Sequence, residues 1–154
     1  MARYAESTQV SSDRSRSEIE KTLARYGADQ FLYGWDRQAA VIGFRMQARM
    51  IRFRLPLPDR TAREFTHTPG RGQKRSEEQV DAAWEQACRQ RWRALALVVK
   101  AKLEAVECGI STFEEEFLAW TMLPDGSTVG DRMLPQLETA YRTGQMPPLL
   151  PWNE

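Results

Sequence analysis

Few residues of the chain have the chemistry of a catalytic site. His67 is the single histidine, and it stands between two threonines in a stretch rich in Pro and Gly. Nucleophilic catalysis needs a Ser, Thr or Cys beside a base, and no GxSxG motif is present. We interpret His67 as a loop residue that caps backbone groups, and we predict no catalytic residue.

A metal-dependent nuclease would need two or three carboxylates that converge on one point. Asp59 is the nearest acidic candidate, but the neighbouring strands carry arginines where the other carboxylates would be needed. Two cysteines and one histidine are too few for a zinc site. The segment PGRGQKR lacks the Gly-Lys-Ser or Gly-Lys-Thr ending of a phosphate-binding loop. We predict no metal and no cofactor, and a hydrolase or nuclease is the third alternative.

Charge is distributed unevenly along the 154 residues. Residues 37–102 carry fifteen basic and six acidic side chains, whereas residues 103–154 carry two basic and nine acidic ones. The middle segment therefore has a net charge of +9 and the C-terminal third one of −7, although the whole chain has +1. Such asymmetry indicates either an anionic partner or pairing of basic and acidic faces within the fold.

Nucleic-acid binding would use Lys and Arg side chains along one surface. Twelve of the fifteen basic residues in the middle segment are arginine, whose guanidinium makes forked contacts with phosphate. We predict seven phosphate contacts, which come from two strands, a loop and a helix: Arg45, Arg52, Arg54, Lys74, Arg75, Arg89 and Arg93. The partner would be single- or double-stranded nucleic acid.

Residues 1–12 show no hydrophobic periodicity and are predicted to form a flexible arm. The helices and strands that must position these side chains come after it. Ser17 with Glu20 has the spacing of a capping box, and Gly27 is a stop signal. We therefore expect a first helix over about residues 16–26.

Alternating apolar and polar residues then predict a three-stranded antiparallel meander. Its strands lie around residues 31–35, 42–46 and 51–57, and their arginines point outward. Residues 58–75 follow as a long loop rich in Pro, Gly and positive charge, and loops of this length are functional or disordered.

The longest helix is predicted to start at Ser76, which has the capping-box spacing to Gln79, and to end at Gly109. Its length of about 48 Å exceeds the width of a domain of this size, so the helix must protrude or bend. Arg91 and Lys102 project from its apolar stripe. Charges in such places must be paired, extended to solvent or reserved for a partner.

The C-terminal third is predicted to be helical. Ser111 with Glu114 has capping-box spacing, and Glu115 follows in the first turn, where the helix dipole favours negative charge. Thr128 with Asp131 predicts a last helix, which ends near residue 144 and is interrupted or kinked by a proline. Four residues are expected to pair internally or to meet a protein partner: Arg91, Lys102, Glu114 and Glu115.

The predicted compartment is the cytoplasm. No stretch approaches the roughly 18 apolar residues of a membrane span, and the N-terminus lacks the apolar run of a signal peptide. We therefore expect no membrane partner. Cys88 and Cys108 fall on the long helix about 30 Å apart, too far for a disulfide, so both are expected to be free thiols.

Two runs carry a resemblance to a known family: WEQACRQRWRALALVVKAKLEAVECGISTFEEEF, residues 84–117, and LPDGSTVGDRMLPQLETAYRTGQMPPLLP, residues 123–151. They resemble a widespread family of small bacteriophage and prophage proteins, and the likeness extends over the chain from about residue 14. It implies phage origin and the host cytoplasm. No activity is established for that family, so no site residue carries over. The order of elements also looks like that of single-strand annealing proteins, whose oligomers hold DNA along a basic groove.

Together these patterns predict one α+β domain over residues 13–154: an N-terminal helix, a three-stranded antiparallel meander, a long helix and a helical C-terminal part. The first functional hypothesis is a non-catalytic phage-type nucleic-acid-binding or DNA-metabolism accessory protein. The alternative is a protein-interaction module, such as an inhibitor of a host defence enzyme or a homo-oligomeric scaffold.

Overall fold

The elements follow the predicted α+β order, and the computed structural model describes them over residues 3–149. In chain order they are α1 (Ser12–Arg25), β1 (Gln30–Trp35), β2 (Ala39–Met46), β3 (Arg49–Pro56), α2 (Arg63–Thr66), α3 (Glu77–Glu107), α4 (Phe113–Phe117), the 3-10 turn η1 (Leu118–Trp120) and α5 (Val129–Thr143). The first two residues of the predicted arm and the last five of the predicted domain lie outside the described residues.

The strands form an antiparallel sheet in the order β1-β2-β3, which confirms the predicted meander. Phe44 of β2 pairs with Phe31 of β1 and with Ile51 of β3, so apolar side chains share one face. Gln47 and Ala48 join β2 to β3, and their φ angles of +49° and +59° are both left-handed. A two-residue loop of this kind is the type I′ turn, whose twist matches that of the strands.

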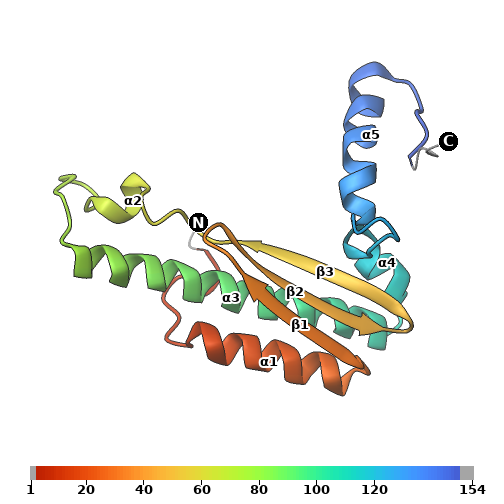
Figure 1. Cartoon of the computed structure of the whole chain (residues 1–154), viewed down its shortest axis with the longest axis horizontal. Coiled ribbons are helices and arrows are strands. Elements are labelled where there is room, and N and C mark those ends of the chain that lie inside the picture. Colours follow the sequence, from red (N-terminus) through yellow and green to blue (C-terminus); the bar gives the residue numbers. More distant parts are fainter. Residues whose placement is uncertain (1–2, 150–154) are drawn as a thin grey trace.

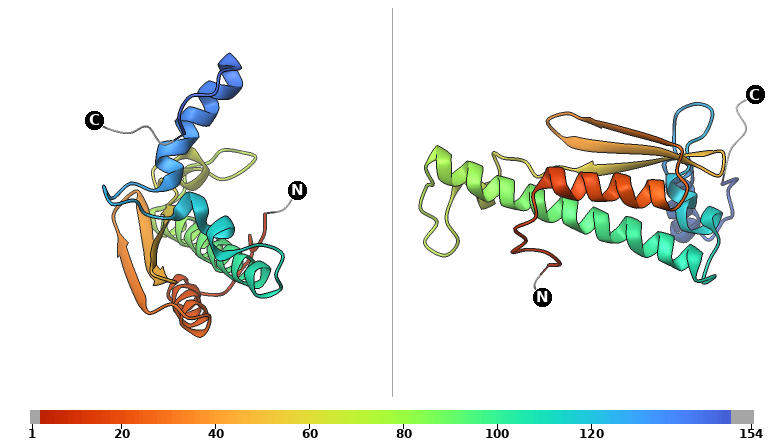
Figure 2. Two further views of the ribbon diagram at one scale, coloured as in Figure 1. Left: turned by 90° about the vertical axis from the view of Figure 1, so that its right-hand side faces the viewer. Right: turned by 90° about the horizontal axis from the view of Figure 1, so that it is seen from below.

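Helices α1 and α3 lie side by side against one face of the sheet (Figure 1, Figure 2). Both helices and the sheet contribute side chains to the buried core between the two layers. Examples are Leu23 of α1, Phe44 of β2 and Leu103 of α3. The opposite face of the sheet has no helix over it among residues 3–149 (Figure 2). We call it the open face.

α4 closes one end of the core. Its Phe117 is completely buried, and the centroid of its ring lies 5.7 Å from that of Phe44 and 6.2 Å from that of Phe53. Phe113 of the same helix lies 4.9 Å from Phe117, measured between ring centroids. These aromatic contacts join the helical C-terminal part to the sheet.

Two helices begin at residues other than those predicted. Ser11 caps α1 by accepting a backbone hydrogen bond from its first turn, so the expected pair of Ser17 and Glu20 lies inside the helix. At α4 the capping box is formed by Thr112 and Glu115, one residue later than expected. In both places several Ser or Thr residues have the spacing of an N-cap, and the prediction from spacing alone selected a residue that does not cap the helix.

The starts of α3 and α5 are confirmed. Their capping boxes are formed by the predicted residues, Ser76 with Gln79 and Thr128 with Asp131. Each helix ends beside a glycine with left-handed backbone, as predicted. α5 continues through Pro135 as one helix, so the first of the two expected effects of this proline, an interruption, does not occur, and the second, a kink, stays a prediction.

The loop over residues 58–75 has more structure than its composition suggested. It contains the short helix α2, and a β-bridge joins His67 to Lys74. Arg75 donates from one nitrogen to the backbone carbonyls of Glu64 and Phe65, at 3.0 and 3.2 Å. These contacts make the loop a folded projection beside the start of α3 (Figure 1).

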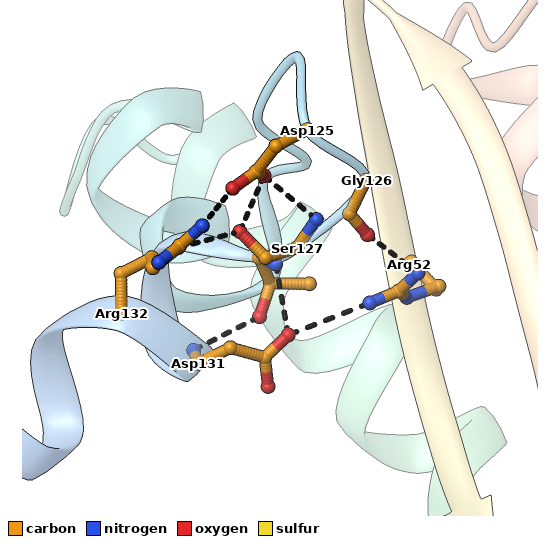
Figure 3. A network of polar contacts seen from close by, with 7 residues as sticks. Arg52, Asp125, Gly126, Ser127, Asp131 and Arg132 are labelled. Carbon is orange, nitrogen blue, oxygen red and sulfur yellow. Dashed lines mark hydrogen bonds and ion pairs between the residues drawn. The ribbon is translucent and has the colours of Figure 1, made fainter. Parts of the chain in front are cut away.

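α5 projects away from the sheet and the other helices (Figure 1). A polar network holds the start of this helix (Figure 3). Arg52 of β3 donates to the carbonyl oxygen of Gly126 at 2.9 Å and lies 3.4 Å from the carboxylate of Asp131. In the same network Asp125 accepts a hydrogen bond from Arg132. β3 therefore helps to set the direction in which α5 leaves the domain.

The first turn of α5 crosses η1 at close range. A Cβ atom on Gly130 would lie only 2.8 Å from the backbone oxygen of Ala119, a separation that side chains do not tolerate. Glycine at this position therefore allows the two backbones to touch. The rest of α5 extends past this contact.

Candidate nucleic-acid interface

The strand arginines predicted to bind phosphate lie on the open face, but two of them are engaged. Arg45 donates to both carboxylate oxygens of Asp29, at 2.8 and 2.7 Å, and this hydrogen bonding lowers the pKa of Asp29. Arg52 belongs to the network at the start of α5. Arg54 is exposed.

The helix arginines lie on the other side of the sheet, on α3. Arg93 donates to both carboxylate oxygens of Glu18 in α1, each at 2.7 Å. Arg89 donates to a side chain of its own helix. Lys74 and Arg75 lie in the loop before α3. Because the sheet separates the strand arginines from those on α3, the seven predicted residues do not form one surface.

Arg91 and Lys102, which stood out within the apolar stripe, both have partners. Arg91 is exposed and donates to the carbonyl oxygen of Pro56 at 3.1 Å. Lys102 is half-buried and donates to the backbone carbonyl of Glu116 at 2.9 Å and to its carboxylate at 3.3 Å. Hydrogen bonds from Ser111 and then from Lys102 lower the pKa of Glu116. Lys102 thus pairs with Glu116 rather than with Glu114 or Glu115.

Acidic side chains outside residues 37–102 neutralise much of the basic segment. Glu114 lies 3.3 Å from Arg49, whereas Glu115 serves the capping box of α4. Five pairs of this kind cross between segments: Arg45–Asp29, Arg49–Glu114, Arg52–Asp131, Arg93–Glu18 and Lys102–Glu116. Internal pairing therefore accounts for a large share of the charge asymmetry.

A different group of cations gathers where α1 lies against α3. A hollow of about 400 Å³ is found there, which we call the α1–α3 groove. It is lined by Arg14, Ser17, Glu18, Lys21, Thr22, Arg25 and Lys100. All four cations are exposed, and three of them follow one face of α1 at spacings of seven and four residues.

The acid in this lining is Glu18, and it is already engaged. Its hydrogen bond with Arg93 lowers its pKa, and attraction to Lys100 and Arg14 lowers it further. Glu18 is therefore ionised at neutral pH, and the charge of Arg93 offsets it. Four positive charges, those of Arg14, Lys21, Arg25 and Lys100, remain to attract an anionic partner.

Sequence reasoning missed this groove because it counted charge by segment. Residues 1–36 carry five basic and six acidic side chains, so their net charge of −1 did not indicate a basic surface. The spacing of Arg14, Lys21 and Arg25 was the available signal. Because the first helix was expected to begin at about residue 16, Arg14 did not fall on it.

A second hollow, of about 470 Å³, lies where the first turn of α1, the end of the sheet and α3 meet. We call it the aromatic cavity, because four rings line it: Tyr33, Trp35, Trp84 and Trp92. Cys88 also lines it, and burial raises the pKa of this thiol to about 11. Cys88 and the exposed Cys108 are both free thiols, as predicted.

The residues considered for catalysis are engaged in local contacts. The carboxylate of Asp59 accepts hydrogen bonds from the hydroxyl and the backbone N–H of Thr61, which lower its pKa. Nδ1 of His67 lies 2.8 Å from the hydroxyl of Thr66. Within residues 3–149, no three His, Cys, Asp or Glu side chains gather as a metal site would require. No helix in that range combines the length and apolarity needed to cross a membrane.

No family model, curated protein or solved structure matches the chain. The resemblance to phage proteins, and the host cytoplasm that it implies, therefore stays a prediction.

Proposed function

We propose that the protein binds nucleic acid without catalysis, as an accessory protein of phage-type DNA metabolism, and that the α1–α3 groove contacts the phosphates. The supporting observation is the set of four exposed cations around an acid that Arg93 neutralises. Lys and Arg contacts with phosphate supply affinity that does not depend on sequence. The hydroxyls of Ser17 and Thr22 can add hydrogen bonds to phosphate oxygens.

The dimensions of the groove suit a short stretch of backbone. From Arg14 to Arg25 the helix advances about 16 Å, which equals the axial length of about five base pairs. Each cation that neutralises a phosphate releases counterions, so affinity falls as salt rises. Four contacts give a slope of log affinity against log salt of about −3 for a single strand and about −4 for a duplex.

Fluorescence anisotropy with a labelled oligonucleotide of about 20 nucleotides, between about 50 and 200 mM salt, tests the proposal. The double variant Lys21→Ala with Arg25→Ala should lose at least about tenfold in affinity at low salt and about half of the slope. The matched control is Arg54→Ala with Arg142→Ala, which removes two exposed arginines outside the groove. Equal losses in both double variants, or no binding at low salt, would contradict the proposal.

A second candidate function is self-association through α5. Leu134 and Tyr141 lie on one side of this helix and are 63% and 91% exposed, an apolar stripe that residues 3–149 of one chain leave in water. Glu138 and Arg142 flank the stripe four residues apart. An antiparallel copy of α5 would place Arg142 of one chain beside Glu138 of the other, which makes the surface self-complementary.

Sedimentation velocity over a range of concentrations tests this candidate. Tyr141→Asp should shift the protein to monomer at concentrations where the unchanged chain associates, because it puts a charge in the apolar stripe. Leu118→Asp is the matched control, because Leu118 is also an exposed apolar residue but lies on η1. A protein that is monomeric at every concentration would rule out this candidate.

A further inference from the structure

Trp35 stands at the mouth of the aromatic cavity. It is the last residue of β1, and 71% of its surface is exposed, although apolar residues such as Ala40 and Leu57 line the same cavity. A ring of this size buries 150–250 Å² when it is covered, so leaving it in water forgoes a large stabilisation. Exposed tryptophan beside a hollow is a feature of binding sites, where a ligand provides the missing contact.

The other rings of the cavity are held in place by the fold. Trp84 donates from Nε1 to the carbonyl oxygen of Pro58 at 2.7 Å. Tyr33 lies between two partners: the guanidinium carbon of Arg16 is 4.3 Å from its ring centroid, and the ring of Trp92 is 5.8 Å away. Because the fold itself supplies these contacts, these rings are held in fixed positions, which reduces the entropy lost on binding.

Polar groups stand among the rings. The lining residues include Ser12, Asp13, Glu85 and Arg89, whose side chains carry hydrogen-bond donors and acceptors. A fitting ligand is therefore flat, with apolar faces for stacking and with both donors and acceptors around its edge. A nucleobase has this combination. The volume of about 470 Å³ lies within the range of small-molecule sites and exceeds what one base needs.

The cavity and the α1–α3 groove meet at the first turn of α1. Asp13 lines the cavity, and the next residue, Arg14, lines the groove. Consecutive residues of an α-helix project about 100° apart, so the two hollows open on neighbouring sides of this turn. A strand whose phosphates lie against Arg14 and Lys21 can therefore place the base of a neighbouring nucleotide over the turn and into the cavity. A base within a duplex is stacked and paired, so it would first have to be extracted at a cost of a few kcal/mol.

We propose that the aromatic cavity binds an unpaired nucleobase of a single strand that the α1–α3 groove holds by its phosphates. This inference rests on the proposed function and narrows its ligand to single-stranded nucleic acid. Trp35 provides the stacking face, and the base displaces water from the ring.

The test combines Trp35→Ala with three ligands of equal length: an oligothymidylate, an abasic strand with the same number of phosphates, and a duplex. Trp35→Ala should weaken binding of the oligothymidylate by about 5- to 150-fold, the range expected for loss of one base–aromatic stack. Its salt slope should stay unchanged, because no phosphate contact is removed. Affinity for the abasic strand and for the duplex should not change. Trp35→Phe keeps a ring at this position and should restore most of the loss.

Intrinsic tryptophan fluorescence gives an independent readout. The oligothymidylate should quench the emission of the unchanged protein, and the abasic strand should not, because only a stacked base contacts the indole. Trp35→Ala should reduce the quenching but not abolish it, because Trp84 and Trp92 line the same cavity. The Lys21→Ala, Arg25→Ala variant should shift the quenching to higher strand concentration.

Three outcomes would overturn the inference. Equal affinity of the unchanged protein for the oligothymidylate and the abasic strand would show that no base is bound, and the groove would keep its proposed function. Loss of abasic-strand binding in Trp35→Ala would assign the effect to the fold or to the backbone contact. Absence of binding to any single strand at low salt would overturn both proposals together.

Discussion

Arg93 donates from its two terminal nitrogens to the two carboxylate oxygens of Glu18, each at 2.7 Å. This pair joins α3 to α1, and it also decides the charge of the α1–α3 groove. Without Arg93 the carboxylate would offset one of the four cations of the lining. With it, Glu18 holds the two helices together while the groove keeps its full positive charge.

Replacing Glu18→Gln should strengthen nucleic-acid binding. The change removes the acid of the lining and frees the charge of Arg93, so affinity at low salt should rise by roughly three- to tenfold and the salt slope should steepen by about 1. The pair is partly exposed, so the free energy of unfolding should fall by no more than about 1 kcal/mol. Glu20→Gln removes the same charge from an exposed position of α1 outside the groove and should leave affinity unchanged. Anisotropy and urea denaturation measure the two effects, and weaker binding in Glu18→Gln would count against the groove.

Replacing Ala48→Gly should stabilise the hairpin of β2 and β3. Ala48 has a φ of +59°, a conformation that costs an alanine about 1 kcal/mol and a glycine almost nothing. The free energy of unfolding should therefore rise by about 1 kcal/mol in urea denaturation. Ala101→Gly, at an exposed position inside α3, is the control and should lower it by about 0.5–1 kcal/mol. A loss of stability in Ala48→Gly would indicate that this turn is not of type I′.

The substitution Gly130→Ala should disturb the contact between the first turn of α5 and η1. The new methyl group would lie 2.8 Å from the backbone oxygen of Ala119, so the first turn of α5 or η1 must shift. We expect a loss of about 1–3 kcal/mol in the free energy of unfolding and faster amide hydrogen exchange in α5. Gly34→Ala serves as the comparison, because a Cβ there meets no atom within 4 Å. If both variants behave alike, the close contact at Gly130 is not important for the position of α5.

The two thiols should differ in reactivity and in their effect on stability. Burial raises the pKa of Cys88 to about 11, whereas Cys108 is exposed, so an alkylating reagent should modify Cys108 first at neutral pH. Mass spectrometry after limited reaction would show this order, and urea should abolish it. An unfolded cysteine ionises near pH 8.5, so this thiol favours the folded state below about that pH. The stabilisation is lost as pH rises towards 11, and Cys88→Ala should reduce that pH dependence.

Local signals predicted the elements well because they depend on neighbours in the chain. Ser76 with Gln79 marked the start of α3, and the alternation around Phe44 gave the sheet. The predicted start of α1 was wrong because Ser11 and Ser17 are both suitable N-cap residues, and the local sequence does not distinguish between them.

The candidate site was harder to predict because it depends on which segments meet. Nothing in the sequence shows that Lys100 of α3 lies beside the basic face of α1, or that Trp84 and Trp35 line one cavity. Net charge by segment was misleading, since the partner of Arg93 lies 75 positions away. Contacts over such separations are properties of the tertiary structure.

The separation of 75 positions between Glu18 and Arg93 affects the order in which the elements fold. Each strand pairs with the next one in the chain, and α3 forms within its own sequence, but α1 docks on α3 by closing a loop of about 75 residues. Contacts between distant segments form late, because closing a long loop costs entropy before any contact compensates for it. We expect the hairpins and α3 to form first and α1 to dock last. Weakening the pair of Glu18 and Arg93 should then speed unfolding more than it slows folding, and the α1–α3 groove should be the last part of the chain to take shape.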